Sequence, residues 1–204
     1  MAELRWVPPM LATAARELPS VETDWSAEAK YDGMRAAALL SDGVLQLRSR
    51  TGRDVTGTFP ELGVLAASAG HRTLILDGEI IAPSDDGRPN FARLQRRMHQ
   101  SHPGRQLLAT VPVVYIAFDL LHIARRPLLR SPYEQRRALL DSLPIQSAAA
   151  DIAPAFPGDA RAVVAATGAM GLEGLVLKRL GSRYLPGRRS PAWLKISSTF
   201  PWPM

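Results

Sequence analysis

The sequence predicts an α+β fold built on antiparallel sheets. Strand-like and helix-like apolar patterns alternate along its 204 residues, without an internal repeat or a coiled-coil heptad. Neighbouring strands are separated by short turns, which suit antiparallel hairpins, whereas parallel strands need long crossover connections. At this length we expect residues 1–204 to form a single domain.

In the first half of the chain, runs of apolar and β-favouring residues predict strands over 25–30, 34–40, 44–49 and 73–83. The Ser41-Asp42-Gly43 segment has turn composition and joins the second and third strands. Residues 59–70 have helical spacing, open after Thr58 and close at Gly70. A second helix is expected over 90–100, with Asn90 near its cap.

In the second half, residues 111–121 are apolar enough for a buried strand. Residues 131–143 predict a helix with Ser131 as its cap, Pro132 in the first turn and Glu134 at the capping-box position. Another helix is expected over 159–171. Strands follow over 174–180 and 192–197, joined by the basic loop GSRYLPGRRSP.

Composition narrows the function classes. The chain is 46% hydrophobic and 22% charged, as in an ordinary globular protein, and has no apolar run of 18 residues, so no membrane partner is expected. It has no cysteine, which is compatible with the cytoplasm. A net charge of +6 and a pI near 10.3 favour a polyanionic partner such as nucleic acid.

Lysine is rare in this arginine-rich chain. It occurs at Lys30, Lys178 and Lys195, against 22 arginines. An ammonium group can lose its proton and act as a nucleophile, which a guanidinium cannot do. We therefore interpret the positions that remain lysine as candidates for chemistry.

All three lysines lie in a series of four charged segments: KYDGMR (30–35), DGE (77–79), EGLVLK (173–178) and WLK (193–195). Strand alternation predicts Asp77 and Glu79 on one face, and Glu173 on the face opposite Lys178. Carboxylates bind Mg²⁺ and cations bind phosphate oxygens, so their convergence would form a phosphate and divalent-metal site. The four histidines have no metal-ligand spacing.

These segments and their flanks resemble the nucleotidyltransferase superfamily of ATP-dependent DNA ligases, RNA ligases and mRNA capping enzymes. The resemblance is closest to bacterial ATP-dependent DNA ligases associated with end joining. It implies two antiparallel sheets flanked by helices, with the nucleotide cleft between them. The motifs, in family order, are PPMLATAARELP, KYDGMR, SRTGRDVTGTFPEL, LILDGEIIAP, VVYIAFDLL and EGLVLKRLGSRYLPGRRSPAWLKI.

The resemblance implies a catalytic role for Lys30, which would attack the α-phosphate of ATP to form lysyl-AMP. The amine must be neutral, a form that nearby cations favour. Lys195 would act on the α-phosphate. The other implied nucleotide-binding residues are Glu28, Arg35, Glu79, Phe118, Glu173 and Lys178, with Glu79 and Glu173 also as ligands of Mg²⁺ or Mn²⁺. Without the resemblance, Phe118 would be interpreted as a core aromatic.

The implied substrate is nicked double-stranded DNA. Candidate backbone contacts are Arg48, Arg50 and Arg53, and Arg188 with its neighbours Arg183 and Arg189 in the Gly-Pro loop. Each could equally be a solvated surface arginine.

Two departures from the family pattern change the expectation. Ser197 stands where the W-x-K-x-K pattern has its second lysine, and nothing after Ser198 resembles the OB-fold domain of complete ligases. We therefore expect an adenylation domain that self-adenylates but seals nicks weakly without an OB-fold or end-joining partner. The alternatives are an RNA ligase, a GTP-using capping enzyme, or a non-catalytic DNA-binding remnant. The flanks SRTGRDVTGTFPEL and RYLPGRRS argue against the first two.

Overall fold

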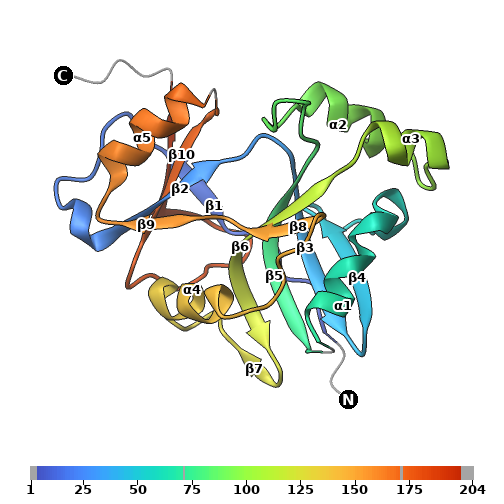
Figure 1. Ribbon diagram of the computed structural model, residues 1–204. Coiled ribbons are helices and arrows are strands. Elements are labelled where there is room, and N and C mark those ends of the chain that lie inside the picture. The colour runs from blue at the N-terminus through green and yellow to red at the C-terminus, as the bar shows by residue number, and fades with distance from the viewer. Residues whose placement is uncertain (1–3, 71, 171, 199–204) are drawn as a thin grey trace.

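The computed structural model describes residues 4–70, 72–170 and 172–198 and contains two sheets. The first, sheet A, has the order β1-β11-β10-β2-β9. Its strands are β1 (Leu11–Ala14), β11 (Arg189–Ser197), β10 (Gly174–Arg179), β2 (Trp25–Lys30) and β9 (Ala155–Pro157). Residues from both ends of the chain therefore lie side by side in this sheet (Figure 1).

The second, sheet B, has the order β4-β3-β5-β6-β7, and β8 pairs with β6. Its strands are β4 (Val44–Ser49), β3 (Met34–Ser41), β5 (Leu74–Ile81), β6 (Val114–Ile123), β7 (Arg126–Pro127) and β8 (Ala150–Ile152). The α+β prediction is confirmed. Most pairings are antiparallel, but β1 with β11 and β6 with β8 are parallel.

Five α-helices and three short 3-10 helices lie around the sheets in the described part of the chain. The α-helices are α1 (Val64–Ser68), α2 (Phe91–Met98), α3 (Arg105–Thr110), α4 (Tyr133–Asp141) and α5 (Ala160–Ala169). The 3-10 helices are η1 (Glu22–Asp24), η2 (Thr56–Thr58) and η3 (Pro60–Gly63). None of the described helices is long and apolar enough to cross a membrane.

The predicted strands 25–30 and 44–49 coincide with β2 and β4, and Asn90 caps α2 by accepting a hydrogen bond from the Arg93 N–H. Two helix predictions need correction. The segment 59–70 divides into η3 and α1. At α4 the backbone is still extended at Pro132 (φ −55°, ψ 150°), so the helix begins at Tyr133 without a side-chain cap. Ser131 is therefore one residue too far back to cap it.

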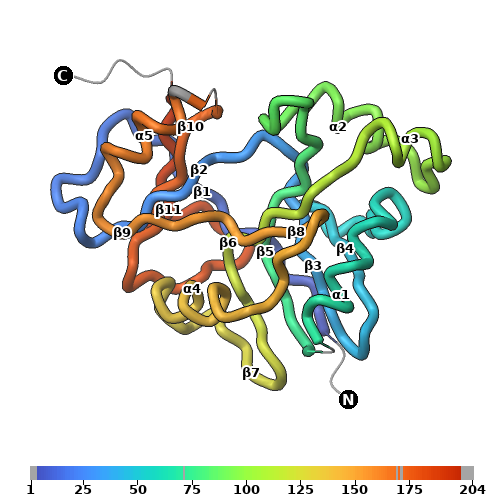
Figure 2. Tube along the Cα trace, viewed as in Figure 1, coloured from blue at the N-terminus to red at the C-terminus, as the bar shows by residue number. Residues whose placement is uncertain are grey.

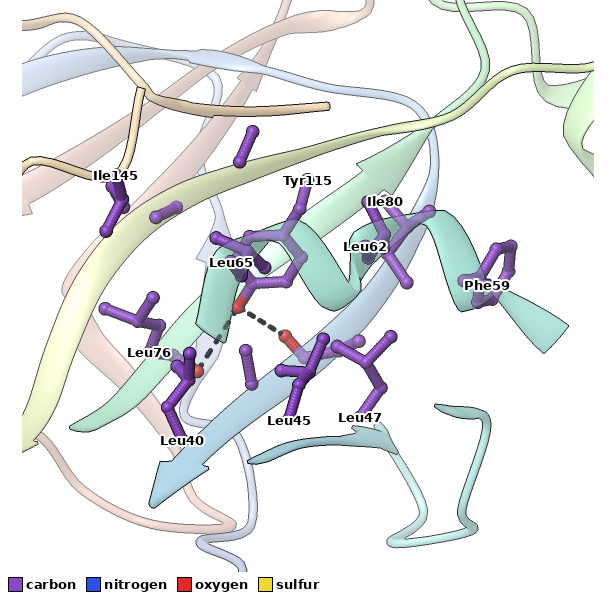
Figure 3. Close-up of a cluster of buried hydrophobic side chains, with 14 of the residues drawn as sticks. Leu40, Leu45, Leu47, Phe59, Leu62, Leu65, Leu76, Ile80, Tyr115 and Ile145 are labelled. Atoms are coloured by element: carbon purple, nitrogen blue, oxygen red, sulfur yellow. Dashed lines mark hydrogen bonds between the residues drawn. The ribbon is translucent and has the colours of Figure 1, made fainter. Parts of the chain in front are cut away.

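The largest core lies between sheet B and α1. Alternate residues of β3, including Ala38 and Leu40, face this core together with Leu65 of α1 and Tyr115 of β6 (Figure 3). The Tyr115 hydroxyl group is buried there and lies 3.0 Å from the carbonyl oxygen of Ala36. On the opposite face of β3, Ala37 and Leu39 pack against the segment before β1 and against Trp193 of β11.

Helix α5 lies against one face of sheet A beside β10 (Figure 2). Its Val163 and Val164 pack there with Leu175 and Leu177 of β10. Because side chains alternate along a strand, Val176 and Lys178 of β10 point to the other face, toward sheet B. Each sheet thus has one face covered by a helix and one face turned toward the other sheet. The space between those inner faces contains the candidate site.

Candidate active site between the two sheets

A cavity of about 290 Å³ opens between the sheets. Sheet A contributes residues of β1, β2, β10 and β11, and sheet B contributes residues of β3, β5 and β6. Seven of the eight residues predicted to be catalytic or to bind nucleotide line it: Glu28, Lys30, Arg35, Glu79, Phe118, Lys178 and Lys195. The eighth, Glu173, reaches the cavity through an ion pair with Lys30. The convergence of these residues in one place is confirmed.

Lys30 ends β2, and its Nζ donates a hydrogen bond to Oε2 of Glu173. The lysine side chain is 24% exposed and the glutamate side chain is 49% exposed, so both remain accessible from solvent. Three residues later, a Cβ on Gly33 would lie 2.2 Å from the carbonyl oxygen of Ile80. A glycine is needed here because the chain leaving Lys30 passes directly against β5.

Glu173 is not placed as strand alternation predicts. It precedes β10, which begins at Gly174 with φ +151°, a value that L side chains rarely adopt. A Cβ there would also lie 2.0 Å from the carbonyl oxygen of Ile196. This glycine changes the direction of the chain, so Glu173 is not bound to the face of Leu175 and Leu177 and instead contacts Lys30.

Arg35 is held rigidly at the base of the cavity. Its Nε and Nη2 donate to the two carboxylate oxygens of Asp77 at 3.0 and 2.6 Å, and the Tyr184 hydroxyl donates to the same carboxylate at 2.6 Å. Its guanidinium also lies 5.3 Å from the ring centre of Phe118 and 5.6 Å from that of Trp193. The bidentate pair and the two rings hold one orientation of the guanidinium.

Glu79 pairs with Arg35 across the β5–β3 ladder and faces the cavity. Burial in the wall raises the pKa of Glu79 to about 8, although the positive charge of Arg35 acts in the opposite direction. In the free protein this carboxyl group is therefore mostly protonated at neutral pH. Its ionisation responds to any cation that enters the cavity.

The buried end of the cavity consists of Glu28, Phe118, Lys178 and Trp193. Lys178 Nζ donates to Glu28 Oε2 at 2.8 Å and to the Phe118 carbonyl oxygen at 2.7 Å. Nζ also lies 4.7 Å from the ring centre of Phe118 and 4.6 Å from that of Trp193. Burial lowers the pKa of Lys178, whereas the Glu28 carboxylate opposes that shift.

The exposed end consists of Lys30, Arg50, Arg189 and Lys195. Within residues 4–70, 72–170 and 172–198, Arg50, Arg189 and Lys195 have no salt-bridge partner. Arg189 donates to the Ala12 carbonyl oxygen of β1. The cations gathered here are suited to an anionic ligand such as a phosphate chain.

The candidate DNA contacts lie in different settings. Arg50 lines the cavity, Arg53 and Arg188 are exposed on the surface, and Arg48 lies 3.6 Å from Asp54 in an ion pair. Their contact with DNA stays a prediction. Among the histidines, His71 lies outside the described residues, and the described part of the chain has no cluster of three or more His, Asp or Glu residues that could hold a metal ion.

Several residues of the site were not predicted from sequence. Val176 lines the cavity beside Lys178, and the alternation of β10 could have indicated it. Arg189, grouped with the DNA candidates, also lines the cavity. Tyr184 and Tyr133 hold site carboxylates from outside the lining, and no local pattern marks either residue.

Comparison with known proteins decides the family. The family model described as "ATP dependent DNA ligase domain" matches residues 9–197. The chain belongs to this family. It is 36% identical over 187 residues to the multifunctional non-homologous end joining DNA repair protein LigD of Mycobacterium tuberculosis, an alignment that covers 92% of the chain and 23% of LigD. It is 31% identical to a probable DNA ligase of Koribacter versatilis, covering 92% of the chain and 38% of that protein.

Solved structures agree with this membership of the ligase domain family. A mycobacterial DNA ligase D complexed with ATP and MES superimposes with a TM-score of 0.81 at 36% identity, over 94% of this chain and 60% of that one. The ligase domain of M. tuberculosis LigD gives a TM-score of 0.80 over 93% and 58% of the two chains. The chain spans about a quarter of the length of the LigD relatives.

Proposed function

We propose that this ligase-family domain catalyses the first step of DNA ligation, its own adenylation by ATP. The observation that carries the proposal is the position of Lys30, an accessible primary amine at the rim of a cavity lined by further cations. Its Nζ attacks the α-phosphorus of ATP, a P–N bond forms, and the bond to the leaving pyrophosphate breaks. The amine must first lose a proton, and Glu173 is the acceptor already in hydrogen-bond contact.

The rest of the cavity suits the parts of ATP. Phe118 and Val176 offer apolar surface for the adenine ring, and Glu28 offers an acceptor for its amino group. Arg35 and Glu79, which both line the cavity, would hold the ribose and orient the phosphates. Lys195 would stabilise the charge that develops on the α-phosphate. The buried end would hold the base and the exposed end the phosphates.

The carboxylates fit magnesium in the manner usual for nucleotide enzymes. Mg²⁺ keeps several waters and binds through one or two carboxylates together with substrate phosphates. Glu173 and Glu79 are acids of this cavity that could complete such a site, without a full protein cage. When bound with ATP, the ion would neutralise phosphate charge.

In the second step, the AMP would pass from Lys30 to the 5′-phosphate of nicked double-stranded DNA. Arg50 at the cavity and the exposed Arg53 and Arg188 would contact the DNA backbone, with Arg48 beside them. We propose that residues 1–204 alone seal nicks weakly and need an OB-fold domain or end-joining proteins for efficient sealing. The names of the bacterial LigD relatives, which mention non-homologous end joining, support an end-joining role. We propose that the chain acts in the bacterial cytoplasm.

The adenylation test uses α-labelled ATP with Mg²⁺ and the 204-residue chain. We expect an acid-labile labelled protein, abolished in Lys30→Ala and in Lys30→Arg, which retains the charge but cannot form the adduct. Arg125→Ala, an exposed change outside the cavity, serves as the matched control and should label normally.

Two further measurements separate the alternatives. Labelling by GTP in preference to ATP would indicate capping-type chemistry. DNA binding with strong salt dependence but no label under any nucleotide would support the non-catalytic alternative and contradict the proposal. Nick sealing is then measured with and without a separate OB-fold domain, and efficient sealing by residues 1–204 alone would contradict the expected need for a partner.

A further inference from the structure

The Glu28 carboxylate accepts hydrogen bonds from two side chains that lie on different elements of the fold. It is 2% exposed on β2 and faces the cavity. Its Oε2 accepts from Lys178 Nζ of β10 at 2.8 Å, and its Oε1 accepts from the Tyr133 hydroxyl, the first residue of α4. A carboxylate has about four lone-pair sites, so each oxygen keeps capacity for a ligand in the cavity.

Tyr133 does not line the cavity, but its own position is fixed. It is 1% exposed, and its ring lies 5.7 Å from the guanidinium of Arg136. Arg136 is held by Asp119 through two hydrogen bonds of 2.8 and 2.9 Å. Burial raises the pKa of Tyr133 well above its ordinary value, so its hydroxyl stays protonated and can act as a donor.

The geometry points to Tyr133 as a positioning residue that fixes Glu28 for the selection of adenine over guanine, an inference that rests on the proposed function. An ionised carboxylate only accepts hydrogen bonds. Adenine presents an amino donor at C6, whereas guanine presents a carbonyl acceptor there. A carboxylate that cannot rotate away would accept a hydrogen bond from the adenine amino group and would repel the guanine carbonyl oxygen. Lys178 places its ammonium group 2.8 Å from one oxygen of the Glu28 carboxylate, and the Tyr133 hydroxyl bonds the other oxygen and so restricts rotation of the carboxylate.

The test is the ratio of ATP to GTP affinity, measured by equilibrium binding alongside self-adenylation and self-guanylation rates. In Tyr133→Phe we expect the preference for ATP to fall about tenfold, the size of one hydrogen bond to a charged group. The ATP concentration that gives half of the maximal self-adenylation rate should rise with little change in that maximal rate, because the lost interaction serves base binding rather than the phosphoryl transfer.

Tyr115→Phe is the matched control. It also removes a buried tyrosine hydroxyl group, but that group bonds the Ala36 carbonyl oxygen in the core and does not touch the cavity. Its ATP preference should equal that of the wild type, even if its melting temperature falls. A fall in preference in both tyrosine variants would overturn the inference, because it would follow from loosening the fold in general.

A double-mutant cycle shows whether Tyr133 acts through Glu28. Glu28→Gln replaces one oxygen by an amide donor and should lower the ATP preference more than Tyr133→Phe. The double variant should match Glu28→Gln alone, because the group that Tyr133 positions is already changed. The double variant also lacks the carboxylate that Tyr133→Phe alone leaves with one donor too few. The double variant can therefore be measured even if Tyr133→Phe fails to fold. A double variant clearly less selective than Glu28→Gln would overturn the inference.

The outcomes for the two proposals are distinguishable. If the wild type labels with ATP but Tyr133→Phe retains its preference within twofold, the positioning role is wrong and the adenylation proposal stands. If the wild type never labels, yet its binding preference for ATP falls in Tyr133→Phe as expected, the adenylation proposal is wrong and the positioning role stands. Equal wild-type affinity for ATP and GTP would overturn the positioning role.

Discussion

At the buried end of the cavity, the Lys178 side chain is 2% exposed and bonded to Glu28, whereas at the exposed end Lys195 is open to solvent and has no salt-bridge partner among the described residues. The two lysines lie on neighbouring strands of one sheet. Burying a charge requires a partner, so the buried lysine is committed to the protein's own structure. The exposed lysine retains its charge for a ligand. If the chain binds ATP as proposed, the buried end is a preformed base site, and the exposed end is a phosphate site whose cations are neutralised by the ligand.

The largest effect is expected from a substitution that breaks the buried ion pair of Lys178 and Glu28. Lys178→Met removes the cation and leaves the Glu28 carboxylate buried beside a single donor, which should lower the free energy of unfolding by about 3–5 kcal/mol. Denaturant unfolding measures the loss. Adding Glu28→Gln to Lys178→Met should recover much of it, since the unpaired charge is then gone. A loss below about 1 kcal/mol for Lys178→Met would mean that the pair is not buried as described.

The matching change at the exposed end should affect rate and not stability. In Lys195→Met we expect self-adenylation to slow about 100-fold, the usual effect of removing one group that stabilises transition-state charge. The free energy of unfolding should stay within about 0.5 kcal/mol of the wild type, as for other exposed changes. Single-turnover labelling and denaturant unfolding give the two values. Equal rates in Lys195→Met and the exposed control Arg125→Met would contradict the division between the ends.

Glu79 lies between the two ends and gives a pH-dependent prediction. Its folded pKa of about 8 is above its ordinary value of 4.5, so between those values the folded state binds more protons than the unfolded state. This group's contribution to stability is therefore greatest below pH 4.5 and is lost as the pH rises through 8. The glutamine in Glu79→Gln does not titrate.

The melting temperature of Glu79→Gln, relative to the wild type, should therefore rise between pH 5.5 and pH 8.5 by roughly a few degrees. Thermal unfolding without nucleotide or metal at the two pH values measures this difference. A constant difference, or one that falls with pH, would show that Glu79 is already ionised in the folded protein.

The smallest effect comes from adding a cation near the exposed end. Ser197 ends β11, two residues after Lys195, and is exposed. An added charge in a solvated position is worth about 1 kcal/mol at contact distance, so Ser197→Lys should raise the self-adenylation rate no more than about fivefold. The increase should shrink at high salt because exposed charges are screened. A rate increase that salt does not reduce would contradict this electrostatic explanation.

The sequence was sufficient to locate the elements that carry their own local signal. Strands such as 25–30 have alternating or continuous apolar residues, and Asn90 stands directly before a helical run that it caps. The strands β1 and β9 were not predicted because they are short and pair with distant segments: β1 joins β11 at the other end of the chain. Their stability comes from tertiary contacts that no local window contains.

The site divides in the same way. The lysines and acids of the four charged segments could be predicted because each segment is a short motif that is visible in the sequence itself. The predicted position of Glu173 was wrong because Gly174, the first residue of β10, has a φ of +151°, and this unusual backbone angle interrupts the alternation before the strand. The support given by Tyr133 could not be predicted, because it joins α4 to a residue 105 positions earlier in the chain.

The most direct test of the central claim, that the exposed end directs ATP to Lys30, is to map the AMP adduct by mass spectrometry after incubation with ATP and Mg²⁺. The chain has lysines only at positions 30, 178 and 195, so the candidate lysines are few and well separated. We predict the adduct on the peptide that contains Lys30 and on no other. An adduct on Lys178 or Lys195, or unchanged adenylation in Lys30→Arg, would contradict the account.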